Sequence, residues 1–143
     1  MSRLHIQQPD LWNFHTQITV HIGDINYGNH LANDAVLRLC HEARLRFLSS
    51  MNYSELNIEG AGLIMLNALV EYKNQAYYGD ILEFSIAITD LSKTGFNLIY
   101  RINRVKDGKI IALAQTGMAF FDYNRQHISR TPDSFRQRLN QVK

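Results

Sequence analysis

The sequence predicts an α+β domain in which one antiparallel sheet packs against one long helix. From Leu31 to about Ser50, apolar residues recur at helical spacing with no Pro or Gly between them. Four later segments alternate in the manner of strands and are joined by short connections, which favours antiparallel pairing. Because apolar residues occupy much of the helix circumference, we expect a strongly curved sheet to cover it.

Composition favours a single domain over residues 1–143. The chain is 45% hydrophobic and 20% charged, with a net charge of +2, and its basic residues are dispersed. This balance does not favour a nucleic acid partner. Neither a signal core nor an apolar run long enough to span a bilayer is visible, so we expect a cytoplasmic protein without a membrane partner. The lone Cys40, within the helical pattern, predicts a buried thiol in a reducing compartment.

The first strand is predicted from Thr16 to Ile22, with Ile18, Val20 and Ile22 on its inner face. The following segment, 23–30, is rich in Gly, Asn and Asp, which indicates a structured loop.

The long helix then presents an apolar stripe and a polar side. The stripe consists of Ala32, Val36, Leu39, Cys40, Ala43 and Phe47. On the polar side, four-residue spacing would allow Arg38 to form ion pairs with Asp34 and with Glu42.

The remaining elements follow from alternation and turn residues. Strands are predicted over 63–72, 81–89, 96–104 and 110–121, the last two joined by a turn at Asp107-Gly108. A short helix is predicted from Pro132 to about Asn140, with Thr131 as its N-cap and Pro132 at its first position.

Two motifs carry a resemblance to a known family. The stretch GDINYGNHLAND, from Gly23 to Asp34, is followed by HEAR from His41 to Arg44, and both resemble the signature of hotdog-fold thioesterases of the 4-hydroxybenzoyl-CoA type. The tripeptide Tyr78-Gly79-Asp80 is similar to that family too.

The resemblance implies a hotdog fold, in which a curved sheet wraps around the long helix. It also implies a homodimer with its two sheets joined edge to edge, or a dimer of such dimers, with active sites shared between subunits. The implied reaction is hydrolysis of an acyl-CoA thioester without a metal or organic cofactor.

One residue departs from the family pattern. Many relatives carry a catalytic aspartate where this chain has Asn26. An amide cannot be deprotonated, so Asn26 can serve neither as nucleophile nor as general base. Either another carboxylate has taken over, or the protein is a non-catalytic module that binds acyl-CoA or acyl carrier protein.

The residues near the helix start offer the chemistry that hydrolysis needs. A carboxylate must attack or activate water, and N–H donors must hold the developing oxyanion. The unpaired N–H groups of the helix N-terminus suit the second task. Asp34, in the first helical turn, is the leading carboxylate, although it could simply complement the helix dipole or pair with Arg38. Asp24 is the second candidate, and its alternative role is to hold the loop by accepting backbone N–H bonds.

Several neighbours could assist. His30 could orient water, bind the thioester carbonyl or cap the helix. Asn26 and Asn33 could bind a water or carbonyl, or act as caps. Gly28 would let the loop approach the thioester closely. The predicted substrate-binding residues of this stretch are Tyr27, Gly28, Asn29 and Asn33.

The turn at residues 92–95 resembles the position where relatives contact CoA, so Lys93, Thr94 and Gly95 are further substrate-binding candidates. Arg101 and Arg104 could add cations for the phosphates, although all these charges could equally be solvated. An acyl pocket or core packing would explain Tyr27, Leu63, Met65 and Tyr78 equally well. The remaining histidines lack metal-ligand spacing, and no metal site is predicted. These are His5, His15, His21, His41 and His127.

Overall fold

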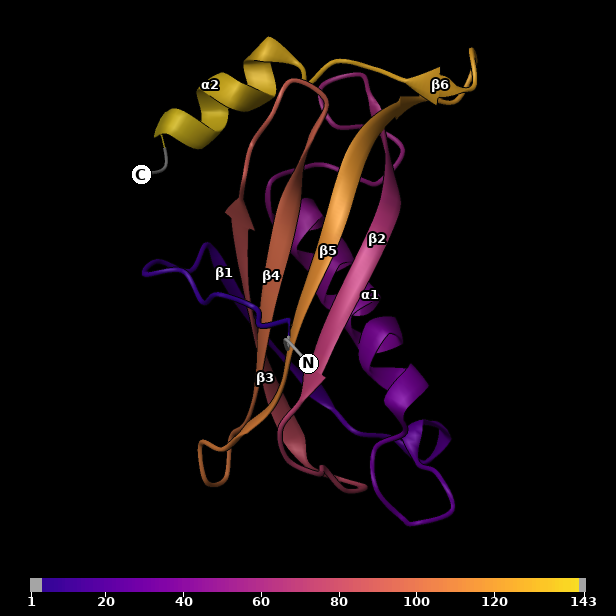
Figure 1. Cartoon of the computed structure of the whole chain (residues 1–143), viewed down its shortest axis with the longest axis vertical. Helices are drawn as coiled ribbons and strands as arrows, with labels where there is room; N and C mark the ends of the chain where they lie inside the picture. The colour runs from indigo at the N-terminus through magenta and orange to yellow at the C-terminus, as the bar shows by residue number, and fades with distance from the viewer. Residues whose placement is uncertain (1–3, 142–143) are drawn as a thin grey trace.

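The computed structural model describes residues 4–141, which form one curved antiparallel sheet with a long helix across one face (Figure 1). The strands are β1 (Phe14–Thr19), β2 (Gly62–Tyr72), β3 (Ile81–Thr89), β4 (Gly95–Arg104), β5 (Ile110–Asp122) and β6 (His127–Ile128). They lie in the order β1-β3-β4-β5-β2, and β6 pairs with β5. The predicted α+β architecture is confirmed.

Helix α1 (Asn33–Ser50) buries the predicted apolar stripe against the inner face of the sheet. Its partners on β3 include Leu82, Phe84 and Ile86, which are fully buried at alternate positions. Cys40 lies in this core, and burial raises the pKa of its thiol to about 12. The buried thiol is therefore confirmed and stays protonated at neutral pH.

The outer face of the sheet is partly covered by the N-terminal segment, which crosses it in front of β4 and β5 (Figure 1). Ile6 packs there against Ile99 and Leu113. The guanidinium of Arg101 stacks over the Trp12 ring at 4.6 Å from its centroid. Within residues 4–141, no helix is long and apolar enough to cross a membrane.

The first strand ends earlier than predicted. β1 stops at Thr19, and the chain turns through a short 3-10 helix, η1 (Ile22–Asp24). Val20 is buried as expected, but Ile22 is exposed. The alternation is broken because the Val20 N–H donates to the Asp80 carbonyl at 2.9 Å and the chain then leaves the sheet.

The strand order in the sheet also differs from the order in the sequence. Short turns do join β3 to β4 and β4 to β5, but β2 pairs with β5 instead of β3. Residues 73–80 carry the chain across the end of the sheet from β2 to β3. Register within each strand follows side-chain alternation, whereas strand order depends on contacts far apart in sequence.

The C-terminal helix α2 (Asp133–Gln141) begins one residue later than predicted. The Thr131 hydroxyl donates to the Ser92 carbonyl at 2.8 Å, so it ties this segment to the β3–β4 turn and the predicted N-cap role is wrong. Phe135 anchors the helix, with its ring centroid 5.5 Å from those of both Phe96 and Phe120. The two-residue strand β6 has no counterpart among the predicted elements.

Candidate active site

The loop that follows η1 folds back on itself before α1 begins. An antiparallel bridge between Ile25 and Leu31 closes it, and the Asn26 N–H donates to the His30 carbonyl at 3.0 Å. The side-chain oxygen of Asn26 accepts the Gly28 N–H at 2.9 Å. Asn26 therefore shapes the loop tip. Asn29 adopts the left-handed region, with φ of +64°, which Asn tolerates better than most residues.

Gly28 makes a close contact with the His30 side chain, whereas the expected approach was to the thioester. A Cβ at this position would lie 2.6 Å from Nε2 of His30. The His30 ring therefore packs directly on the Gly28 backbone. This contact orients the imidazole at the base of the loop.

Asp24 is buried and fully engaged. One carboxylate oxygen accepts the His21 N–H at 2.9 Å, and the other accepts Nη1 of Arg38 at 2.8 Å. Burial alone would raise the pKa of Asp24, but the His21 hydrogen bond and the Arg38 guanidinium outweigh it and hold the pKa below its usual value. These contacts match the loop-holding alternative for Asp24.

Neither ion pair that helical spacing allows for Arg38, with Asp34 or with Glu42, forms in the structure. Arg38 reaches Asp24 instead, and Glu42 pairs with Arg46 at 2.8 Å. The Asp24 side chain is only 6% exposed, whereas that of Arg38 is 55% exposed. A buried carboxylate needs a partner more than an exposed one does, so the loop carboxylate takes the guanidinium.

Asp34 lies in the first turn of α1 as predicted, and its side chain is exposed. Among residues 4–141, its carboxylate has no hydrogen-bond or ion-pair partner. No side chain caps this helix end, because Ala32 occupies the N-cap position. Asp34 lines an open pocket together with Asn26, Tyr27 and Arg38. A free carboxylate thus lies beside uncapped helical N–H groups.

His30 and Asn33 line a different pocket, on the other side of the helix start. That pocket continues to Tyr72 and Ala76, and the Tyr72 hydroxyl donates to the Asn33 carbonyl at 3.0 Å. The side chain of Asn33 does not cap α1. The structure therefore gathers the predicted catalytic residues around one helix end but not in one pocket. Asn26 and Asp34 share a pocket, whereas His30 lines a second and Asp24 a third.

The HEAR motif lies farther along α1, where Ala43 and Arg44 are buried and His41 and Glu42 are exposed. Arg44 is buried, and it donates to Oε2 of Glu55 and to the Tyr100 hydroxyl, both at 3.0 Å. The Tyr100 hydroxyl in turn contacts that of Thr116 at 2.8 Å. This part of the signature stabilises the packing of α1 on the sheet.

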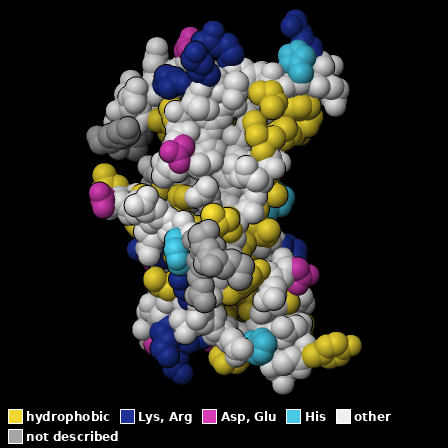
Figure 2. All heavy atoms as spheres, in the orientation of Figure 1, with side chains coloured by type: hydrophobic (Ala, Val, Ile, Leu, Met, Phe, Trp, Pro, Cys, Tyr) yellow, Lys and Arg dark blue, Asp and Glu magenta, His cyan; other side chains and the backbone are white. Residues whose placement is uncertain are grey.

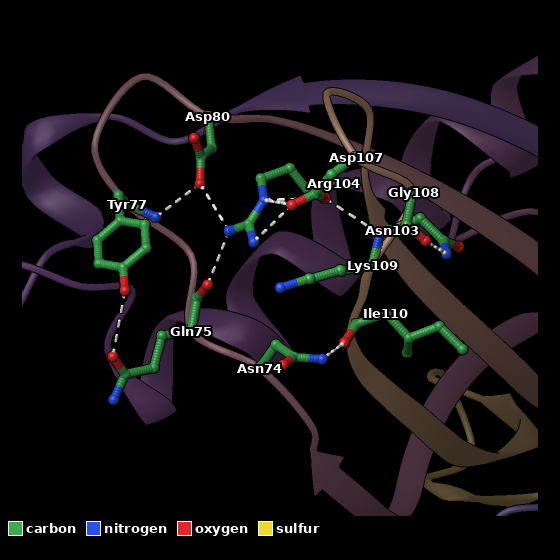
Figure 3. A network of polar contacts seen from close by, with 10 residues as sticks. All are labelled: Asn74, Gln75, Tyr77, Asp80, Asn103, Arg104, Asp107, Gly108, Lys109 and Ile110. Carbon is green, nitrogen blue, oxygen red and sulfur yellow. Dashed lines mark hydrogen bonds and ion pairs between the residues drawn. The ribbon is translucent and has the colours of Figure 1, made fainter.

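A polar network that we did not predict centres on Arg104 and holds the segment between β2 and β3 (Figure 3). Nη1 of Arg104 donates to the Gln75 carbonyl at 2.8 Å and to Asp80 at 3.3 Å. Its Nε and Nη2 donate to Asp107 at 3.1 Å each. Hydrogen bonds to Asp107, and to Asp80, raise the pKa of Arg104. Arg104 is committed to these contacts, so its suggested role in binding CoA phosphates is not supported.

Lys93, Thr94 and Gly95 lie far from the pockets within one chain. They follow the end of β3 at Thr89, whereas the site loop adjoins its beginning at Ile81. Nine residues of strand separate the two ends by roughly 30 Å. Figure 2 shows Lys and Arg side chains gathered at the end that carries this turn. One chain alone does not bring these residues to the helix start.

The four apolar residues considered for an acyl pocket do not form one. Leu63 is buried in the core, whereas Tyr27, Met65 and Tyr78 are exposed on separate elements. Figure 2 likewise shows exposed hydrophobic side chains in separate patches. Within the described residues, no group of three His, Cys, Asp or Glu side chains could hold a metal ion.

Comparison with known proteins shows the family and the fold. Over 100 residues, the chain is 30% identical to a 1,4-dihydroxy-2-naphthoyl-CoA hydrolase from Synechocystis sp., covering 68% of this chain and 72% of that protein. The fold matches the crystal structure of a 1,4-dihydroxy-2-naphthoyl-CoA thioesterase from Synechocystis, with a TM-score of 0.78, 24% identity, and coverage of 87% of this chain and 93% of that one.

A structure from the thioesterase superfamily of Jannaschia sp. CCS1 matches with a TM-score of 0.81 and 16% identity, covering 94% of this chain and 85% of that one. These structural matches confirm the hotdog fold. A sequence profile described as the thioesterase-like superfamily matches residues 20–139. The chain therefore belongs to the thioesterase-like superfamily.

Proposed function

We propose that this protein hydrolyses acyl-CoA thioesters at the N-terminal end of α1, with Asp34 as the catalytic carboxylate. The observation that carries this assignment is the pairing of Arg38 with Asp24, which leaves Asp34 without a partner among the described residues. Family membership and the naming of a relative as a CoA hydrolase support the reaction class.

The chemistry follows from this arrangement. The thioester carbonyl oxygen binds the unpaired N–H groups at the helix start, where the helix dipole favours negative charge. Asp34 accepts a proton from a water molecule as that water attacks the carbonyl carbon. When the tetrahedral intermediate collapses, the carbon–sulfur bond breaks and Asp34 returns the proton to the CoA sulfur. The products are the free acid and CoA.

Neighbouring residues would position the water and substrate. Asn26 lines the same pocket as Asp34, and its amide nitrogen has no partner among residues 4–141. It can donate to the attacking water or to the tetrahedral intermediate. His30 and Asn33 line the pocket on the other side of the helix start, which suits contacts to the acyl or pantetheine portion.

The proposal includes a homodimer, the unit from which a dimer of dimers would be built. β2 is the edge strand beside β5, and Met65 and Leu66 are exposed on it. An edge strand with unpaired N–H and C=O groups favours pairing with another strand. Since Lys93, Thr94 and Gly95 lie at the opposite end of the sheet, CoA in the site could reach this turn only on a second copy of the chain. We place the reaction in the cytoplasm, where Cys40 would remain reduced.

A second candidate function is a non-catalytic module that binds acyl-CoA or acyl carrier protein. The observation that favours it is Asn26, an amide in the position where many relatives carry their acid. In this case acyl-CoA would bind with measurable affinity and release no CoA.

Turnover of short, long and aromatic acyl-CoAs, followed with a thiol reagent, tests the proposal. In Asp34→Asn we expect kcat to fall by about 10²–10⁴-fold with the melting temperature unchanged, because an amide cannot accept the proton. Glu42→Gln is the matched control, an acidic side chain of the same helix paired with Arg46. Parent-level kcat in Asp34→Asn would contradict the role of Asp34. Binding without turnover by the parent protein would favour the binding module.

A further inference from the structure

The segment between β2 and β3 connects the sheet to the site loop. The Leu31 N–H, just before α1, donates to the Ala76 carbonyl at 2.7 Å. His30 and Tyr77 form an antiparallel bridge, so two consecutive loop residues lie on this segment. Ala76 is fully buried. The position of His30 and of the helix start therefore depends on where residues 75–77 lie.

Arg104 holds that segment from the opposite side. Nη1 donates to the Gln75 carbonyl at 2.8 Å, and the next carbonyl along the chain is the one that accepts Leu31 (Figure 3). The Gln75 carbonyl is thus bonded to the sheet through Arg104, and the adjacent Ala76 carbonyl is bonded to the site loop through Leu31. Arg104 is the last residue of β4, whose pairing with β3 and β5 makes it a rigid base.

Two carboxylates keep the guanidinium in this position. Asp107 accepts from Nε and Nη2, and Asp80 accepts from Nη1 at 3.3 Å while also accepting the Tyr77 N–H at 2.9 Å. The Arg104 side chain is only 12% exposed. A planar guanidinium can make this fork of contacts in three directions, which a single ammonium group cannot reproduce.

We propose that Arg104 is a positioning residue for the active site, which fixes His30 and the N-terminal end of α1 through the Gln75 and Ala76 carbonyls. This inference rests on the proposed thioesterase function. Arg104 does not touch the substrate. It sets the direction of the helical N–H groups that receive the oxyanion, and small misplacement of such groups costs catalysis strongly.

The test combines kinetics with amide hydrogen exchange on the full-length protein. In Arg104→Gln, we expect kcat to fall about 10- to 100-fold with little change in KM, because substrate contacts remain but their orientation is lost. The Leu31 amide should exchange about tenfold faster or more. The Ser92 amide, which donates to the Gly95 carbonyl at the far end of the sheet, should exchange at the parent rate. Arg104→Lys should recover part of both effects.

Arg138→Gln is the matched control. Like Arg104, Arg138 donates to a backbone carbonyl, that of Met51 at 2.6 Å, but it lies at the far end of the molecule, where it stacks on the Tyr53 ring. Its loss should lower the melting temperature without changing Leu31 exchange.

Parent-like Leu31 exchange in Arg104→Gln would overturn the inference, as would equal acceleration in Arg138→Gln. Absence of thioesterase activity in the parent would overturn the proposed function, and Leu31 exchange would still decide whether Arg104 holds the loop.

Discussion

The two ends of the sheet are stabilised by different forces. At the end that carries the site, charged side chains hold loops in place, with Arg38 on Asp24 and Arg104 on Asp80 and Asp107. At the opposite end, an aromatic cluster holds α2 against β4 and β5. Its members are Tyr53, Phe96, Phe120 and Phe135, with ring centroids 5.5–5.9 Å apart.

This difference shows which end of the sheet leaves polar groups accessible to a substrate. Aromatic packing stabilises without leaving polar groups accessible. Directional hydrogen bonds instead fix a loop while its other side stays open to solvent. Asp24 and Asp34 show a similar contrast at the start of α1. The Asp24 carboxylate is bonded to His21 and Arg38, whereas that of Asp34 is left available. Substitutions at the aromatic end should therefore cost the most stability, and substitutions at the site end should cost less stability but alter the geometry of the candidate site.

The largest effect on stability is expected at the aromatic end. Phe135→Ala removes a buried ring from the cluster, and the free energy of unfolding should fall by about 3–5 kcal/mol. Denaturant unfolding measures this change. Activity of the remaining folded protein should match that of the parent. Leu56→Ala, an exposed apolar residue, is the control and should cost less than about 0.5 kcal/mol. A smaller loss in Phe135→Ala than in the control would refute the comparison.

A smaller, pH-dependent effect is expected for Asp24→Asn at the site end. The hydrogen bonds to this carboxylate involve a charged acceptor, so the loss should be about 1.5–3 kcal/mol near neutral pH. Because the folded-state pKa lies below the ordinary value of 3.8, the contribution of Asp24 is present above that pH and is lost as pH falls through the folded-state pKa.

Denaturant unfolding of the parent and of Asp24→Asn across acidic pH checks this sign. The difference in the free energy of unfolding should be constant above about pH 5 and should shrink below 3.8. A difference that grew as pH fell would show that Asp24 is not held in its ionised form by Arg38.

The smallest effect on stability is expected for Gly28→Ala. The new methyl group would displace the His30 ring, but Gly28 does not have a positive φ, so the cost should be less than about 1 kcal/mol. The ring resonances of His30 should shift in NMR spectra. Gly23→Ala, where a Cβ meets nothing within 4 Å, should leave those resonances in place. Unchanged His30 resonances in Gly28→Ala would contradict the packing of its ring on Gly28.

Local patterns predicted individual elements well. The bounds of β3 agree with the alternation of its apolar residues, and α1 begins two residues later than predicted. The placement of Asp34 in the first turn also followed from helical periodicity. These features depend on residues a few positions apart, which one short stretch of sequence contains.

The role of each polar side chain was harder to predict, because partners are chosen by burial. Four-residue spacing allowed Arg38 to contact Asp34 or Glu42 on its own helix, yet Arg38 pairs with the buried Asp24. From the sequence, Arg104 could be a solvated or phosphate-binding cation. In the structure it instead donates to the Gln75 carbonyl and to Asp80, both on the segment from β2 to β3. Tyr78-Gly79-Asp80 was noticed as a motif, but its connection to Arg104 spans 24 residues.

The sequence by itself determined the fold class, the long helix and the family resemblance, and it indicated the segment where we propose the active site, since periodicity and a contiguous motif are local properties. Only the tertiary structure decided the strand order, the separation of the candidate site residues into different pockets and the freedom of Asp34. These features depend on which polar groups are buried when segments distant in the sequence pack together. A buried charge or carbonyl then forms a hydrogen bond or ion pair with a group that the fold places nearby.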